Sequence, residues 1–554
     1  AQAAALKQPR ILFVHRNRAP SPGPQSSQAE AAPDLSSRAM ALAVRGGASP
    51  VELTAMLLGY AKELTALVKE PLQVPERAQN ALSAAETGAK ADSPEVALQK
   101  ALDALFEVSP LYKDLIHNNS ALKHSRDKAV KMAEKASDLF KAGDDLMAYG
   151  SALRCAGRLQ VLKGRPENAM KVANEAASIF RQVGSTKGEA DTLCVCVDAR
   201  VAKASLVGTE KFERQFTKLK KTAAEAEKES KELRDKLLEE AQSEARNVVA
   251  LYKSIKDRKA MADMYCTLSD IYTAKDDVDR GREAAQEAKD HYGDIGDAKG
   301  QQTAIQLEIE ACIVGGDGNE ALQVAQDAVQ LFKKSRDIEL EAQAHYQVMR
   351  IMFMRGDFDD LMKYSTEARD VCRRSGDVEA ESLVLDCVMK THITKDDNEK
   401  AEEIARETLE LFKRANHKMG MAASMHAVAA LVLEKFFKDY EDALKELKTM
   451  GYNSEYWKEP DVTRYNESIS MVNEAYDIFT ELGEKEARRD VEETMSTITV
   501  RGTMLNDPDE TRSILRDGRL QEVINTWNIN GQGEIIPDGG SKAIADEERA
   551  ALEN

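Results

Sequence analysis

The residues in this sequence best suited to redox, nucleophilic or metal chemistry are seven cysteines and eight histidines. The histidines are dispersed, and none has the spacing to a cysteine, a carboxylate or a second histidine that a zinc site requires. Cys194 and Cys196 are two residues apart on a predicted helix, so their thiols face different sides and do not form a CxxC redox motif. No glycine-rich phosphate loop of either usual form is present. The sequence therefore predicts no catalytic residue, no cofactor and no metal ion, and the cysteines are interpreted as small core residues.

One motif near the C-terminus has side chains of the type that bind calcium. Asn528, Asn530 and Gln532 precede a glycine, and this order resembles the start of an EF-hand loop. The side chains are amides, however, and the twelfth position of the loop is Gly539 in place of the bidentate glutamate. Little negative charge is available to hold Ca²⁺. We interpret the segment as a degenerate EF-hand-like hairpin, or an ordinary Asn/Gly turn, within a C-terminal tail over residues 501–554.

The charge composition limits the classes of partner that the protein is expected to bind. Among 554 residues, 77 are Lys or Arg and 95 are Asp or Glu, which gives a net charge of −18. A field of this sign repels phosphate, so we expect neither nucleic acid nor an anionic membrane as partner. No stretch approaches 18 uncharged apolar residues, and no membrane span is expected. The odd cysteine count fits a reducing compartment, and the expected location is cytoplasmic.

Two regions precede the regular part of the chain. Residues 1–50 carry six basic residues against two acidic ones and include a Pro/Ser-rich stretch over residues 19–27. This arm is predicted to be disordered or to be a targeting segment, and a targeting role would make the protein organelle- or cytoskeleton-associated. Residues 51–119 form an N-terminal helical region, because their apolar residues follow the spacing of a helix face.

The regular part of the chain repeats itself. A bulky pair, in most cases aliphatic then aromatic, recurs at 139–140, 179–180, 251–252, 291–292, 331–332, 371–372, 411–412 and 478–479. From 251 to 411 the spacing is 40 residues at every step. Turn residues keep the same period at Gly164, Asp276, Gly316, Gly356 and Asp396, and small residues keep it at Ala136, Ala176, Ala288, Ala328, Ala368 and Thr408. Each 40-residue unit is predicted to be two antiparallel helices, which must stack on their neighbours to bury their apolar faces.

These two-helix units, with small residues at fixed positions and a Gly/Asp turn, resemble tetratricopeptide repeats. The 40-residue period is similar to the variants found in G-protein signalling modulators, rapsyn and kinesin light chains. The resemblance covers residues 120–500 and implies an all-α, right-handed superhelical solenoid of tetratricopeptide-like helical hairpins. It also implies that the first helices line the ligand surface. Because the first helices between Arg258 and Glu434 contain no asparagine, a carboxylate-clamp co-chaperone is not expected.

Two insertions interrupt the period. The first is a predicted helix over residues 209–252 whose narrow, coiled-coil-like seam is covered by a neighbouring repeat or by a partner chain. The second is a predicted aromatic loop over residues 438–465, which either plugs the end of the solenoid or binds a partner. The candidate partner-binding residues in these insertions are Phe212, Phe216, Leu219, Leu233, Leu237, Tyr452, Tyr456, Trp457 and Tyr465.

The sequence favours a non-catalytic function. We expect a protein–protein interaction scaffold or adaptor, a subunit of a larger assembly, with other proteins as partners. Glu308, Glu310 and Glu379 on first helices either attract a basic segment or form a solvated charged face. The alternative is a regulatory protein, calcium-responsive or enzyme-associated, with its activity in the N-terminal helices or the tail. The sequence does not determine the oligomeric state.

Overall fold

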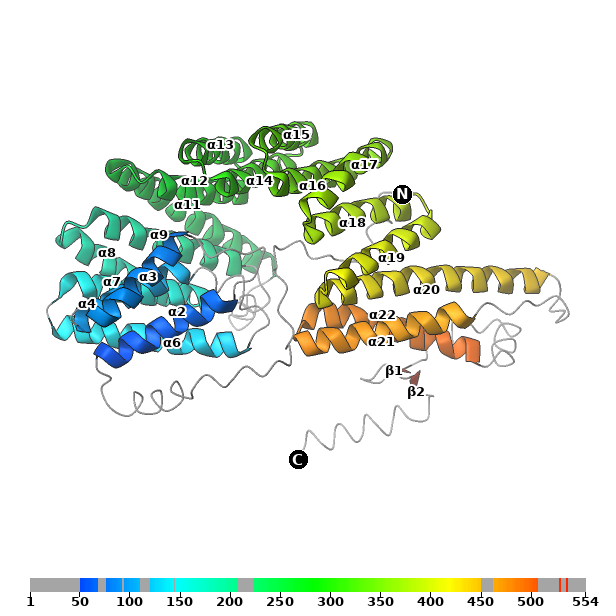
Figure 1. The fold of residues 1–554 in the computed structure, drawn as a ribbon, viewed down its shortest axis with the longest axis horizontal. Helices are drawn as coiled ribbons and strands as arrows, with labels where there is room; N and C mark the ends of the chain where they lie inside the picture. Colours follow the sequence, from blue (N-terminus) through cyan, green and yellow to red (C-terminus); the bar gives the residue numbers. More distant parts are fainter. Residues whose placement is uncertain are drawn as a thin grey trace, which may run out of the picture. The chain divides into compact units, whose positions relative to one another are not determined.

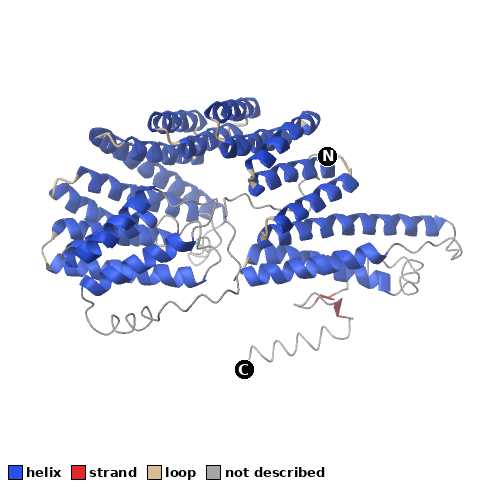
Figure 2. Cartoon of the chain, in the orientation of Figure 1, coloured by secondary structure: helices blue, strands red, loops and turns tan. Residues whose placement is uncertain are grey.

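The computed structural model describes residues 50–67, 76–91, 94–109, 120–143, 145–207, 223–449, 462–506, 528–529 and 535–536. These residues are almost entirely helical (Figure 2). The chain divides into two compact units, and the division falls between Arg355 and Gly356. We call the part up to Arg355 the N-terminal unit and the part from Gly356 the C-terminal unit.

Helices of the N-terminal unit follow one another in antiparallel hairpins (Figure 1). From α6 to α16, each described helix packs against the next described helix along the chain. A further contact joins α4 to α7. The helices are α2 (Pro50–Leu67), α3 (Glu76–Ala91), α4 (Pro94–Val108), α6 (Ser120–Ala142), α7 (Leu146–Leu162), α8 (Pro166–Gln182), α9 (Thr186–Leu206), α11 (Ala223–Ile255), α12 (Arg258–Ala274), α13 (Val278–Ile295), α14 (Ala298–Val314), α15 (Gly318–Ser335) and α16 (Ile338–Arg355).

The C-terminal unit continues the same pattern. Its elements are α17 (Phe358–Ser375), α18 (Val378–Thr394), α19 (Asn398–Arg414), α20 (Lys418–Thr449), α21 (Val462–Leu482), α22 (Lys485–Asn506), β1 (Asn528–Ile529) and β2 (Ile535–Ile536). Each described helix again packs on its successor. β1 and β2 pair antiparallel, with Asn528 opposite Ile536. The residues between these two strands lie outside the described residues, so the interpretation of the tail segment as a degenerate EF-hand-like hairpin or an ordinary turn stays a prediction.

The 40-residue translation is visible in the helix bounds. The first helices of successive units begin at Arg258, Ala298, Ile338, Val378 and Lys418, and the second helices begin at Val278, Gly318, Phe358 and Asn398. Both series advance by 40 residues at every step. Within each unit the hairpins pack on their neighbours. The fold class predicted from the sequence, an all-α array of tetratricopeptide-like hairpins, is confirmed.

The turns show a shorter period of 20 residues. A residue with positive φ ends successive helices at Lys256, Asp276, Gly296, Gly316, Arg336, Gly356, Gly376, Asp396 and Asn416, and earlier at Gly164 and Gly184. Such a left-handed residue stops a helix and turns the chain. The next residue is usually an aspartate that caps the following helix; Asp297, for example, accepts a hydrogen bond from the Gly300 amide at 2.9 Å. The sequence identified only alternate members of this series.

The bulky pair has a definite packing partner. Its second residue lies against the residue eight positions later, in the first turn of the next helix. A Cβ added at Gly188, Gly300 or Gly420 would overlap the ring of Phe180, Tyr292 or Phe412, respectively. Glycine at these positions therefore allows an aromatic ring to close the turn between consecutive helices. The pair closes the turn between one hairpin and the next.

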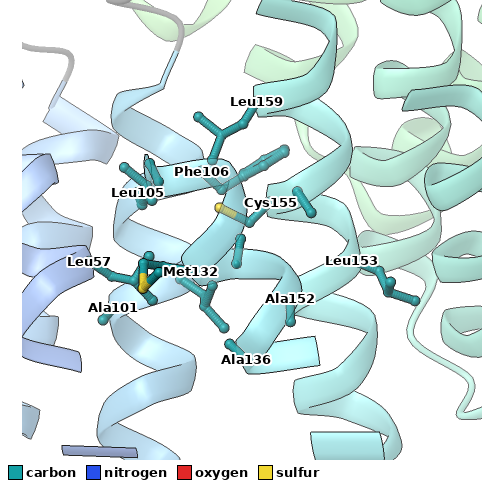
Figure 3. Close-up of a cluster of buried hydrophobic side chains, with 14 of the residues drawn as sticks. Leu57, Ala101, Leu105, Phe106, Met132, Ala136, Ala152, Leu153, Cys155 and Leu159 are labelled. Atoms are coloured by element: carbon teal, nitrogen blue, oxygen red, sulfur yellow. The ribbon is translucent and has the colours of Figure 1, made fainter. Parts of the chain in front are cut away.

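The largest hydrophobic cluster joins the N-terminal helices to the first hairpins. In Figure 3, Leu57 of α2, Ala101 and Leu105 of α4, and Met132 of α6 lie close to α7. The cluster makes α2–α4 a packed end of the array instead of a separate domain.

Cys155 belongs to this cluster and is fully buried, and in total five of the seven cysteines are buried. This supports their interpretation as core residues.

The two predicted insertions are described only in part. The described part of α11 begins at Ala223, so the segment 209–222 lies outside the described residues. Helix α20 extends to Thr449 and α21 begins at Val462, so both ends of the predicted 438–465 loop are helical.

Residues 418–439 of α20 are long and apolar enough to cross a bilayer by length and composition. Because 67% of that window is buried inside the unit, α20 is a core helix of the hairpin array.

Candidate functional site

A cavity of about 230 Å³ opens on the first-helix side of the N-terminal unit. It is lined by Phe106, Glu107, Arg158, Asp191, Cys194, Asp198, Tyr252, Ala260, Asp263, Met264 and Thr267. These residues come from α4, α7, α9, α11 and α12. The helices α7, α9 and α12 are first helices of three hairpins, so stacking of the hairpins creates the pocket. We call it the α7–α9–α12 pocket.

A buried charge network supports one wall of the pocket. The Arg154 guanidinium lies 3.1 Å from Asp191 and 2.6 Å from Asp103, and only 8% of Arg154 is exposed. Burial acts to lower the pKa of Arg154, but the carboxylates of Asp103 and Asp191 outweigh it and hold that pKa above its usual value. Arg154 therefore stays charged, and it fixes the position of Asp191.

Tyr252 completes this wall from α11. Its hydroxyl donates to Asp191 at 2.8 Å and lies 3.2 Å from the Cys194 sulfur. Burial is the main cause of the raised pKa of the Tyr252 hydroxyl, and burial also raises the pKa of the Cys194 thiol. A thiol that stays protonated near neutral pH is a weak nucleophile. Cys194 thus contributes shape and a weak hydrogen bond, not covalent chemistry.

A second group of lining residues combines an aromatic ring with an ion pair. The Arg158 guanidinium lies 4.9 Å from the centre of the Phe106 ring, and the Arg154 guanidinium lies 4.4 Å from the same ring. Arg158 also pairs with Asp198 of α9 at 3.3 Å. Cations are attracted to the face of an aromatic ring. Helix α4 therefore supplies Phe106 as a platform on which two arginines of α7 are held.

The third side of the pocket belongs to α12. Ala260, Asp263, Met264 and Thr267 recur at helical spacing and so share one face. The Tyr292 hydroxyl donates to Asp263 at 2.6 Å. The lining includes four carboxylates, those of Glu107, Asp191, Asp198 and Asp263, and one cation, that of Arg158. Four negative charges against one positive charge leave a net charge of −3 on the lining.

Chemistry of other kinds is not favoured by the geometry. In the ranges that the structure describes, no three His, Cys, Asp or Glu side chains are grouped so that they could hold a metal ion. The pocket itself holds carboxylates, one free thiol with a raised pKa and one arginine. This arrangement can bind a polar or charged group, and it contains no activated nucleophile.

The predicted seam of the long helix is only partly described. Leu237 is 6% exposed and Leu233 is half-buried, and both pack with Ala204 of α9. Helix α9, the other helix of the same hairpin, therefore covers this part of the seam, which removes the reason to propose a partner chain at Leu233 and Leu237. Phe212, Phe216 and Leu219 lie outside the described residues.

The three predicted acidic residues lie in different environments. Glu308 is 2% exposed and accepts hydrogen bonds from Gln286 at 2.7 Å and Lys289 at 2.8 Å. It is a buried structural carboxylate, so the prediction that it lies on an open face is wrong; its partners come from the preceding second helix, α13. Glu310 pairs with Arg350 of α16 at 2.6 Å. Glu379 is exposed, near the start of α18 in the C-terminal unit.

The aromatic candidates remain predictions. Tyr452, Tyr456 and Trp457 lie outside the described residues. Tyr465 lies in the first turn of α21 and so belongs to a helix, not to the loop in which the sequence placed it. Among the candidates that the structure describes, none lines the α7–α9–α12 pocket.

The sequence analysis missed the pocket residues. Arg154, Arg158, Asp191 and Asp198 are spread over two helices and show no motif. One signal was available: Arg158 and Asp198 are 40 residues apart, so they occupy the same position of consecutive repeats. Opposite charges at one repeat position are neighbours once the hairpins stack.

No protein-family model and no curated protein matches the chain. Among solved structures, the chain is similar to tetratricopeptide-like repeats of a Podosopora anserina kinesin light chain, with 12% identity, coverage of 41% of this chain and 95% of that one, and a TM-score of 0.30. It is similar to aspartyl phosphate phosphatase F from Bacillus subtilis, with 11% identity, coverage of 70% and 95%, and a TM-score of 0.34. It is also similar to yeast Tom70, with 13% identity, coverage of 86% and 75%, and a TM-score of 0.36.

The class of the protein follows from its own geometry. The 40-residue translation of paired helices, the left-handed turns every 20 residues and the stacking of consecutive hairpins define an array of tetratricopeptide-like repeats. The solved structures named above share 11–13% identity with the chain at TM-scores of 0.30–0.36, so the class rests on the geometry of this chain alone.

Proposed function

We propose that this chain is a non-catalytic scaffold that binds a segment of another protein on the first-helix face of its N-terminal unit. The observation that carries the proposal is the α7–α9–α12 pocket, which three stacked first helices build together. Repeat arrays present extended surfaces of this kind and bind through shape and charge. The pocket offers fixed carboxylates and an aromatic platform, which suit recognition.

The chemistry of the pocket supports binding in preference to catalysis. The raised pKa of Cys194 keeps that thiol protonated, and the Tyr252 hydroxyl is engaged with Asp191. Asp191 is itself held by Arg154. Side chains that hydrogen-bond to one another in this way form a fixed binding surface. A general base or nucleophile, in contrast, needs an accessible atom whose pKa suits proton transfer or attack near neutral pH.

Site-specific photocrosslinking in native extract tests the proposal. A benzophenone amino acid at position 267, which lines the pocket, should form adducts with a defined protein partner. The same group at position 283, an exposed residue of α13, is the matched control and should not. Asp198→Lys should abolish the adduct at position 267, because it places a cation where the pocket is acidic. Equal adducts from both positions, or none from position 267, would contradict the proposal.

A further inference from the structure

We infer that the α7–α9–α12 pocket receives a cationic side chain, an arginine, from the bound segment. The inference rests on the proposed function, since it names the group of the partner that enters the pocket. Four observations support it: the charge of the lining, the way its carboxylates are held, the mixture of apolar and acidic walls, and the size of the cavity.

The net charge of the lining sets the sign of the ligand. The lining carboxylates Glu107, Asp191, Asp198 and Asp263, together with Asp103 behind them, carry five negative charges. Arg158 in the lining and Arg154, which bridges Asp103 and Asp191, carry two positive charges, so the formal net charge of the group is −3. A cleft with low-dielectric walls focuses such a field, so it attracts a cation and repels an anion.

The carboxylates are held in place before any ligand arrives. Tyr252 donates to Asp191, Tyr292 donates to Asp263, and Arg158 pairs with Asp198. These donors come from α11, α13 and α7. Because the acceptors are fixed, a bound cation does not have to order them, and this preorganisation favours affinity.

The shape of the lining suits an arginine in particular. Ala260 and Met264 give α12 an apolar strip beside Asp263, against which the methylene stem of a long side chain can pack. A guanidinium carries five donors in a planar fork, so it can meet carboxylates on different helices, whereas an ammonium acts as a compact point charge.

The cavity has the size of a side chain, not of a cofactor. Its volume is about 230 Å³. Pockets for small-molecule ligands usually measure roughly 300–1,000 Å³. A pocket below that range, on a surface built by stacked helices, is suited to anchor one residue of a longer segment. The remaining contacts would then lie along the first-helix face.

Methyl NMR with a minimal peptide tests the inference. The probe is acetyl-Gly-Arg-Gly-amide, titrated into the full chain labelled with ¹³C in its methionine and alanine methyl groups. The Met264 and Ala260 signals, assigned with Met264→Leu and Ala260→Gly, should shift and saturate. The twin peptide with citrulline, a neutral isostere of arginine, should cause no saturable shift. Asp263→Asn should weaken binding about fivefold or more, because a hydrogen bond to a charged group is lost. Asp279→Asn, at an exposed site on α13, is the matched control and should not.

The outcomes separate this inference from the proposed function. Equal shifts with the arginine and citrulline peptides, or shifts unaffected by Asp263→Asn, would overturn the assignment of a cationic ligand. Adducts at position 267 without any shift from the arginine peptide would also overturn it and leave the scaffold function standing. A specific shift without adducts would support the pocket chemistry and contradict the scaffold function.

Discussion

Replacement of Arg154 by methionine tests the buried network that supports the pocket. Methionine fills much of the space of the arginine stem but carries no charge. Asp191 is 6% exposed and would lose the guanidinium 3.1 Å away, so its buried charge would keep only the Tyr252 hydroxyl among its side-chain donors. Removing one partner of a buried ion pair destabilises a protein by about 3–5 kcal/mol. The Asp103 side chain is 38% exposed, so its pair with Arg154 adds less than about 1 kcal/mol.

The assay must report on α7 and α9 themselves, because an array of two units need not unfold in one transition. Native-state hydrogen exchange measured by mass spectrometry over Leu146–Leu162 and Thr186–Leu206 gives that local free energy. We expect Arg154→Met to lower it by about 3–5 kcal/mol. Adding Asp191→Asn removes the unpaired charge, so the double variant should be less destabilised than the sum of the two single variants by more than about 1 kcal/mol.

Arg374→Met is the matched control for this experiment. Arg374 is exposed in the C-terminal unit, where it donates to the Asp370 carbonyl oxygen at 3.4 Å. Its loss should change stability by less than about 0.5 kcal/mol. If Arg154→Met changes the local free energy as little as the control does, or if the two network substitutions are additive, the network does not hold the pocket in the way described.

Three further predictions concern the repeat itself. Gly300→Ala should destabilise the N-terminal unit by roughly 1–3 kcal/mol in urea unfolding, because the added methyl overlaps the Tyr292 ring; a stabilised variant would contradict this packing. Arg336→Gly should raise stability by about 1 kcal/mol, because φ is 60° at this position and a side chain is strained there; unchanged thermal unfolding would refute it. Burial lowers the pKa of His426 to about 4, so its contribution to stability is complete above about pH 6.5 and falls as pH drops toward 4. Between pH 7 and 5 the loss should be roughly 2 kcal/mol in the wild type, and a His426→Gln variant should lack it; parallel pH profiles would exclude this role.

Local signals were sufficient to predict the repeat from the sequence. The left-handed turn at Gly316 and the cap at Asp317 act within a few residues of themselves, and the bulky pair acts on a residue eight positions away. Because these interactions are short-range, the residues that make them recur periodically in the sequence. The stacking of hairpins then follows, because no single hairpin can bury its apolar face alone.

Burial of charged residues could not be predicted in the same way. Glu308 has the sequence context of an exposed helix residue, yet it is 2% exposed because Gln286 and Lys289 of α13 satisfy it. A carboxylate enters a core only when its partners are in place, and those partners depend on how one helix rotates against the next. The rotation of one helix against the next cannot be read from the spacing of residues in the sequence.

The sequence by itself determined the all-helical class, the 40-residue period and the position of every second turn, because each depends on neighbours along the chain. Only the tertiary structure decided the pocket. Phe106, Arg158, Asp198 and Asp263 are separated by 40 to 65 residues at successive steps, and they meet because α4 packs on α7 and the first helices stack. The charges gathered there depend on three-dimensional packing across hairpins, which acts through space and leaves no local pattern in the chain.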